Sequence, residues 1–89
     1  MKLSVIVPVY NERDMLMDAI KAVLAVERAD EIIIVDDGST DGTRDLYPQI
    51  AALDDRISIY LHNRNRGKGA ALRTGFKRAT GEIFLIQDA

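Results

Sequence analysis

The chain has 89 residues, 47% of them hydrophobic, a net charge of −2 and no cysteine. This length allows one small domain over 1–89, and the lack of cysteine excludes disulfides and thiolate metal sites. The weakly acidic balance argues against a nucleic-acid-binding protein, which needs a basic surface. No apolar run approaches the ~20 residues of a transmembrane helix, and the short run after Lys2 is a strand rather than a signal peptide. We therefore expect a cytoplasmic domain.

Four short runs rich in β-branched residues predict strands, at 3–9, 31–36, 57–61 and 82–87. Three helix-like segments separate them. This alternation is typical of right-handed βαβ units and a parallel sheet. We predict an α/β fold, a three-layer sandwich with a mostly parallel sheet in the strand order 3-2-1-4.

The first helix is predicted over 12–26, with Asn11 as its N-cap. The second is expected to be capped by Asp41 or Thr43, to break or kink near Tyr47 because Pro48 lacks a backbone donor, and to continue to about Leu53. The third is predicted over 68–79. The first and third helices each place apolar residues on one face: Met15, Leu16, Ala19, Ile20, Val23 and Leu24, then Ala71, Leu72, Gly75, Phe76 and Ala79.

Polar residues follow three of the strands at their carboxyl ends. Residues 8–12 follow the first strand, residues 36–42 the second, and Asp88 ends the fourth. With the predicted strand order, these ends meet where the chain reverses direction, which is where open α/β sheets bind ligands. A calcium-binding EF-hand loop beginning at Asp37 is excluded, because Pro48 stands where the bidentate glutamate belongs.

The basic loop at 62–69 is not a P-loop, because it lacks the first glycine at the required spacing. Its glycine amides and Lys68, next to a helix N-terminus, can nevertheless hold a phosphate. Arg64 and Arg66 can add charge-assisted contacts to a diphosphate. His62 stands alone, which favours a structural role.

Four segments in this order resemble the opening of family 2 glycosyltransferases: Pro8–Glu12, Asp36–Gly42, Asn65–Ala71 and Gln87–Ala89. The resemblance is closest to the polyprenyl-phosphate branch, which includes dolichyl-phosphate mannose synthases. It implies the Rossmann-like nucleotide-binding half of a GT-A fold. It also implies a metal site for Mg²⁺ or Mn²⁺ that uses Asp88, and a nucleotide site formed by Pro8, Tyr10, Glu12, Asp36, Asp37 and Lys68.

By this resemblance, the parent protein transfers a sugar from a nucleotide-diphosphate sugar to an acceptor, with polyprenyl phosphate as a candidate. Its acceptor and catalytic residues are expected beyond Ala89, so we expect the chain to be an inactive fragment of a protein associated with the cytoplasmic face of a membrane. Two alternatives stay open at this point. One is a nucleotidyltransferase or another sugar-nucleotide enzyme of like architecture, and the other is a non-catalytic nucleotide-binding module.

The predicted fourth strand is an edge strand in this order. Its core, residues 83–86, contains no proline or lysine to block pairing with another strand. We therefore expect the chain to form a homodimer or a larger assembly through this strand.

Overall fold

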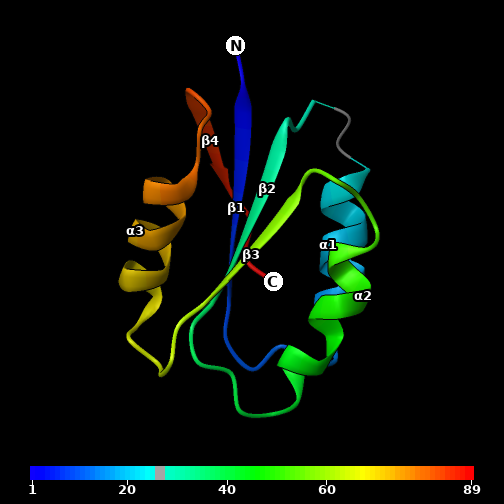
Figure 1. Cartoon of the computed structure of the whole chain (residues 1–89), viewed down its shortest axis with the longest axis vertical. Helices are drawn as coiled ribbons and strands as arrows, with labels where there is room; N and C mark the ends of the chain where they lie inside the picture. The colour runs from blue at the N-terminus through cyan, green and yellow to red at the C-terminus, as the bar shows by residue number, and fades with distance from the viewer. Residues whose placement is uncertain (26–27) are drawn as a thin grey trace.

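Four parallel strands form the middle layer of the fold, in the order β3-β2-β1-β4. The structure is a computed structural model that describes residues 1–25 and 28–89. Figure 1 shows α1 and α2 on one side of the sheet and α3 on the other. The predicted three-layer architecture and strand order are confirmed. The elements are β1 (Leu3–Val9), α1 (Leu16–Leu24), β2 (Glu31–Asp36), the 3₁₀ helix η1 (Thr43–Leu46), α2 (Tyr47–Ala51), β3 (Ile57–Leu61), α3 (Lys68–Arg78) and β4 (Ile83–Ile86).

The two central strands, β1 and β2, are buried on both faces, which explains why they read as continuous apolar runs. Alternate residues of each strand point to opposite faces, so each strand contributes to two cores. The core under α1 and α2 contains Val5, Val7, Val9, Ile32 and Ile34 with Leu16, Ile20 and Ile50. The core under α3 contains Ile6, Ile33, Val35 and Ala71.

Helix α3 lies very close to β1, and Gly75 makes this approach possible. A Cβ atom at Gly75 would stand 2.5 Å from Cγ2 of Ile6. Phe76 was predicted to face the core, but it is 42% exposed. Its ring instead packs edge-on against Phe84 of β4, with the ring centroids 5.4 Å apart.

Helix α1 begins at Leu16, four residues later than predicted, and the prediction of Asn11 as its N-cap was wrong. Asn11 adopts a left-handed conformation with φ 51°, whereas an N-cap residue typically lies in the β region. Met15 was expected to be buried and is 60% exposed. The predicted helix end at Val26 lies outside the described residues.

The second helical segment is split as predicted. A 3₁₀ turn ends at Leu46, and α2 follows with Pro48 in its first turn, where a missing donor costs no helical hydrogen bond. Within the described parts of the chain, no helix combines the length and apolar character needed to cross a bilayer.

Candidate functional site

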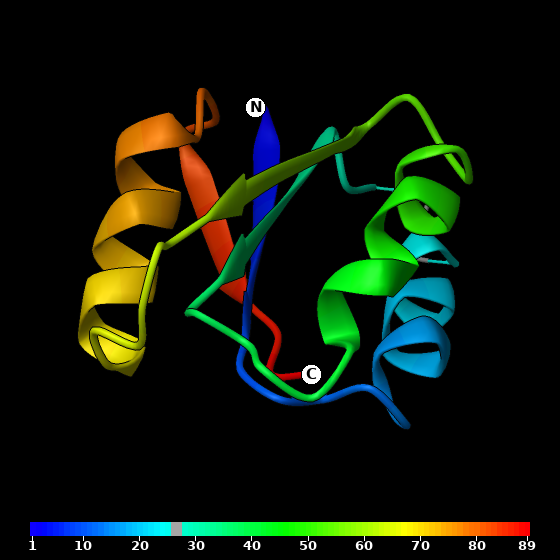
Figure 2. The ribbon, with the colours of Figure 1, turned by 60° about the horizontal axis from the view of Figure 1, so that its bottom comes forward.

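A pocket of about 220 Å³ opens at the carboxyl edge of the sheet. In Figure 2 the loops that follow β1 and β2 come together at this edge, near the end of the chain. The pocket combines a tyrosine ring, acidic side chains and one lysine. Its lining residues are Pro8, Val9, Tyr10, Glu12, Asp37, Lys68, Ala71, Asp88 and Ala89.

The loop after β1 is tied to the loop after β2 through Asn11. The backbone N–H of Asn11 donates to Oγ of Ser39 at 2.9 Å, and Oδ1 of Asn11 accepts from the N–H of Thr40 at 2.7 Å. Asparagine tolerates the left-handed conformation that this double contact requires. These two hydrogen bonds therefore fix the loop immediately after Tyr10, whose side chain is 45% exposed at the pocket.

Asp36 ends β2 and is fully buried behind the pocket. Its carboxylate accepts hydrogen bonds from the N–H of Ser39 at 2.8 Å, from Nε of Arg44 at 3.1 Å and from the hydroxyl of Tyr47 at 2.5 Å. Burial alone would raise the pKa of Asp36, but the hydrogen bonds, led by that of Tyr47, outweigh it and lower the pKa. Burial and the Asp36 carboxylate in turn raise the pKa of Tyr47.

Asp37 forms part of the pocket wall and holds the basic loop in place. Its carboxylate accepts from the backbone N–H groups of Arg66 and Gly67, each at 2.9 Å. Nδ1 of His62 lies 2.9 Å from the same carboxylate, and Nε2 of His62 lies 2.8 Å from the hydroxyl of Thr74. His62 is buried with both ring nitrogens engaged, so it links β3, Asp37 and α3 within the protein interior.

The basic loop also packs directly on the loop after β2, at Gly38. A Cβ atom there would stand 2.4 Å from backbone atoms of Arg64 and Asn65, and the φ of Gly38 is +80°. Only glycine fits such a contact in this conformation. Asp37 and Gly38 together thus place the N-terminus of α3 beside the pocket.

Lys68, the first residue of α3, reaches across the pocket to Asp88. Its Nζ lies 2.7 Å from Oδ1 of Asp88, and both side chains are exposed. Among the described residues, no group of three His, Cys, Asp or Glu side chains could hold a metal ion. Asp88, the residue predicted to bind a metal, is instead paired with Lys68 in this structure.

The structure brings six of the seven predicted site residues to this pocket: Pro8, Tyr10, Glu12, Asp37, Lys68 and Asp88. Asp36 does not reach it. Sequence reasoning missed the supporting partners Arg44, Tyr47 and Thr74, which lie 8 to 12 residues along the chain from the groups they bind. The only sequence signal for these partners was the polar loop after β2, and a polar loop does not indicate which residues bind one another.

Comparisons with known proteins identify the family and the fold. The model of the family described as Glycosyl transferase family 2 matches residues 4–89. An uncharacterized glycosyltransferase of Nostoc sp. is 45% identical over 91 residues, which cover 100% of this chain and 28% of that protein. The undecaprenyl-phosphate 4-deoxy-4-formamido-L-arabinose transferase of Proteus mirabilis is 38% identical and covers 99% of this chain and 28% of its own length. The chain thus spans little more than a quarter of these relatives.

Solved structures show the same fold. The mannosyltransferase PcManGT from Pyrobaculum calidifontis, in complex with GDP-Man and Mn²⁺, superposes with a TM-score of 0.89 at 32% identity over 98% of this chain and 27% of its own. Residues 1–349 of S. aureus TarS, in complex with UDP, give a TM-score of 0.86 at 28% identity over 99% of this chain and 27% of theirs. These neighbours are GT-A glycosyltransferases, which confirms the predicted fold class. With a family match over almost its whole length, the chain belongs to glycosyltransferase family 2.

Proposed function

We propose that this chain binds the nucleotide of a nucleotide-diphosphate sugar, as part of an enzyme that transfers the sugar to an acceptor. The observation that carries the proposal is the single pocket shared by Tyr10, Glu12, Asp37, Lys68 and Asp88. It lies at the carboxyl edge of the sheet, where the topology favours ligand binding. The family match favours this transferase over a nucleotidyltransferase or a non-catalytic binding module.

The nucleoside is assigned to the loops after β1 and β2. The exposed ring of Tyr10 can stack on a base, and Glu12 can accept hydrogen bonds from ribose hydroxyls. Asp37 already accepts three hydrogen bonds, and a carboxylate offers about four acceptor positions, so it can take one more from the nucleoside. Asp36 contributes indirectly, because its carboxylate fixes the loop that carries Asp37 and Ser39.

The diphosphate is assigned to Lys68 and the N-terminus of α3. Free amides and the helix dipole favour an anion there, and Lys68 adds a charge-assisted contact. Lys68 must exchange its ion pair with Asp88 for one with a phosphate oxygen when the ligand arrives. The GDP-Man and UDP named for the two structural neighbours support this ligand class.

The acceptor we propose is a polyprenyl phosphate, supported by the name of the Proteus mirabilis relative. Its phosphate oxygen would form a bond to the anomeric carbon as the bond from that carbon to the diphosphate breaks. The nucleoside diphosphate then leaves with the electron pair. A lipid acceptor lies in a membrane, and we propose the cytoplasmic face of that membrane as the place of the reaction.

A divalent cation is proposed to join this site only together with the nucleotide. Mg²⁺ and Mn²⁺ prefer oxygen ligands and are commonly held by one or two carboxylates plus substrate phosphates, so Asp88 can supply one ligand and the diphosphate others. The Mn²⁺ in the mannosyltransferase complex supports this. We expect Mn²⁺ to bind measurably by calorimetry with GDP or UDP present and not without it. Equal binding to Asp88→Asn would contradict the assignment.

Self-association through β4 is also proposed, because its four residues are each 43–45% exposed at the edge of the sheet. Unpaired backbone groups and apolar side chains occur there together, which favours pairing with another strand.

Titration with GDP and UDP, followed by backbone amide chemical shifts, tests the proposed function. We expect shifts confined to residues 9–13, 36–39 and 66–69. Lys68→Ala should weaken binding of the diphosphates about fivefold, the effect of one exposed charge contact, and leave binding of the free nucleosides unchanged. Lys21→Ala on α1, which removes the same charge, should change neither. Shifts spread evenly over the chain, or none at millimolar ligand, would overturn the proposal.

A further inference from the structure

The charges of the chain are sharply segregated. Residues 56–81 contain seven of the twelve Lys and Arg residues and none of the fourteen Asp and Glu residues. This segment comprises β3, the basic loop and α3. Three of these cations, Arg66, Arg73 and Lys77, lie together along α3 and the loop before it.

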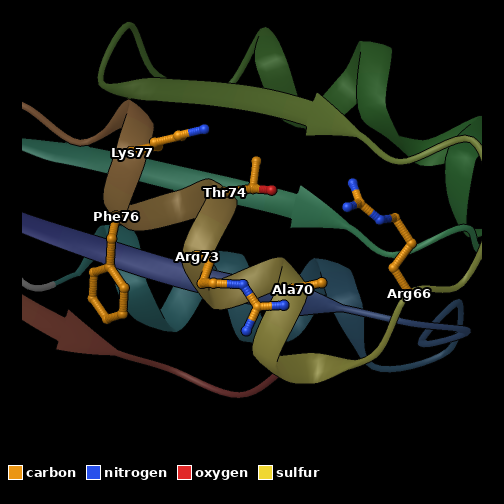
Figure 3. A pocket seen from close by; sticks show the side chains of 6 residues that line it. All are labelled: Arg66, Ala70, Arg73, Thr74, Phe76 and Lys77. Atoms are coloured by element: carbon orange, nitrogen blue, oxygen red, sulfur yellow. The ribbon is translucent and has the colours of Figure 1, made fainter.

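A second pocket, of about 510 Å³, lies beside these cations, away from the nucleotide site. Figure 3 shows its lining: Arg66 comes from the loop before α3, and Arg73 and Lys77 come from the helix itself. Thr74 points to the same side as Lys77, and Phe76 points away from it. Arg66, Arg73, Lys77 and Phe76 are all exposed, and we call these four residues the α3 basic surface.

In the described parts of the chain, the cations of the α3 basic surface have no acidic partners. Across residues 1–25 and 28–89, no carboxylate forms an ion pair with Arg66, Arg73 or Lys77. Arg73 and Lys77 stand four residues apart on the helix, where like charges repel. The surface therefore lowers the stability of α3 slightly and leaves three cations free for an external anion.

The chemistry of this surface fits an anionic bilayer. Clustered basic side chains are attracted to acidic lipid headgroups, and each Lys or Arg near the membrane surface adds to the attraction. A single-stranded nucleic acid would require several free aromatic faces for stacking. Here one ring is exposed, and its packing on Phe84 already occupies part of it.

We propose that the α3 basic surface binds anionic phospholipid headgroups. The role of this binding rests on the proposed function. Arg66 lies one residue from the loop–helix junction that borders the nucleotide pocket. Contact through this surface therefore holds the pocket close to the bilayer that contains a lipid acceptor. The surface itself is separate from the pocket, since they share no lining residue.

Co-sedimentation with vesicles tests this. We expect the chain to bind vesicles made of equal parts phosphatidylcholine and phosphatidylglycerol and not vesicles of phosphatidylcholine alone. The double variant Arg73→Gln/Lys77→Gln should weaken binding at least about tenfold. The control Lys21→Gln/Arg28→Gln removes the same charge from exposed positions elsewhere and should retain most of the vesicle binding. Circular dichroism verifies that each variant is folded.

Three results would overturn the proposal: equal weakening in both double variants, equal binding to neutral vesicles, or release from vesicles by a short single-stranded oligonucleotide at lower concentration than by soluble phosphatidylglycerol headgroup. The nucleotide titration separates this proposal from the proposed function. Intact amide shifts with GDP or UDP alongside failed vesicle binding would reject the α3 basic surface alone. Vesicle binding without those shifts would reject the nucleotide site alone.

Discussion

Two adjacent aspartates at the end of β2 have separate structural tasks. Asp36 binds Ser39, Arg44 and Tyr47 and so anchors the segment that leads into α2. Asp37 binds the backbone of the basic loop and so anchors the start of α3. Neighbouring carboxylates repel each other, and hydrogen-bond donors to each one offset that cost; here each carboxylate has its own donors. The pair therefore joins the helices on opposite faces of the sheet to one strand end.

Tyr47→Phe tests the role of Asp36. The pKa of Asp36 is lower in the folded chain than in the unfolded one, so its contribution to the free energy of unfolding is complete above about pH 4 and is lost as the pH falls through the folded-state value. Removing the tyrosine hydroxyl should lower the free energy of unfolding by about 1–2 kcal/mol at neutral pH. Tyr47→Phe should also lose less stability than the unchanged chain when the pH is lowered, because the substitution raises the folded-state pKa of Asp36.

Urea unfolding at neutral pH and near pH 3 measures both effects. Tyr60→Phe is the control, since within the described residues its hydroxyl forms no hydrogen bond, and its ring contacts Arg78. The role given to Asp36 would be contradicted if Tyr60→Phe lowered the free energy of unfolding as much as Tyr47→Phe does. It would also be contradicted if the acid dependence of stability were unchanged in Tyr47→Phe.

At the level of elements, α3 is positioned by its contact with β1. Gly75 lets the helix approach Ile6 of β1 closely. Gly75→Ala should lower the free energy of unfolding by about 1–3 kcal/mol, because the new Cβ overlaps a fully buried side chain. Gly69→Ala, on the same helix, meets only the flexible end of Arg73 at 3.4 Å. It should be neutral or stabilising by up to about 1 kcal/mol. Equal effects in urea unfolding would show that the α3–β1 contact is not tight.

The strands could be predicted because their signal is local. Runs such as Ile32–Val35 are short and rich in β-branched residues, which predicts a strand buried on both faces, and β1, β2 and β3 begin and end where predicted. The start of α1 could not be predicted from capping rules, because Asn11 is held by Ser39 and Thr40, 28 and 29 residues away. For the same reason, the exposure of Phe76 depends on Phe84, whose position is set by sheet pairing.

At the scale of the whole molecule, the strand order determines the pocket. Placing β1 beside both β2 and β4 brings Tyr10, Asp37 and Asp88 to one edge, although they are far apart in the sequence. That juxtaposition followed from the alternation of elements and from the family resemblance. Neither the alternation of elements nor the resemblance indicated that Asp36 is buried. It lies behind the pocket because its side chain turns into the interior, where Arg44 and Tyr47 bind it.

The same strand order leaves β4 at an edge with both its backbone and its side chains open. Residues Ile83 to Ile86 pair with β1 on one side, and Phe76 of α3 covers Phe84 in part. The opposite edge strand, β3, is less open, because its residues from Ile57 to Tyr60 are half-buried. A second copy is therefore expected to add at β4.

The simplest closed arrangement is a symmetric dimer in which two β4 strands pair antiparallel. Such pairing satisfies the free backbone groups of both strands and removes apolar side chains from water. Sedimentation velocity of the dilute chain should show a dimer or larger species, and Leu85→Lys should shift the distribution toward monomer. Leu53→Lys introduces the same charge at an exposed leucine that lies outside β4 and should leave the association unchanged. Circular dichroism separates loss of association from loss of folding. A well-folded monomer across the micromolar range would contradict β4 pairing, and an equal shift in both variants would assign the association to net charge instead of to this edge.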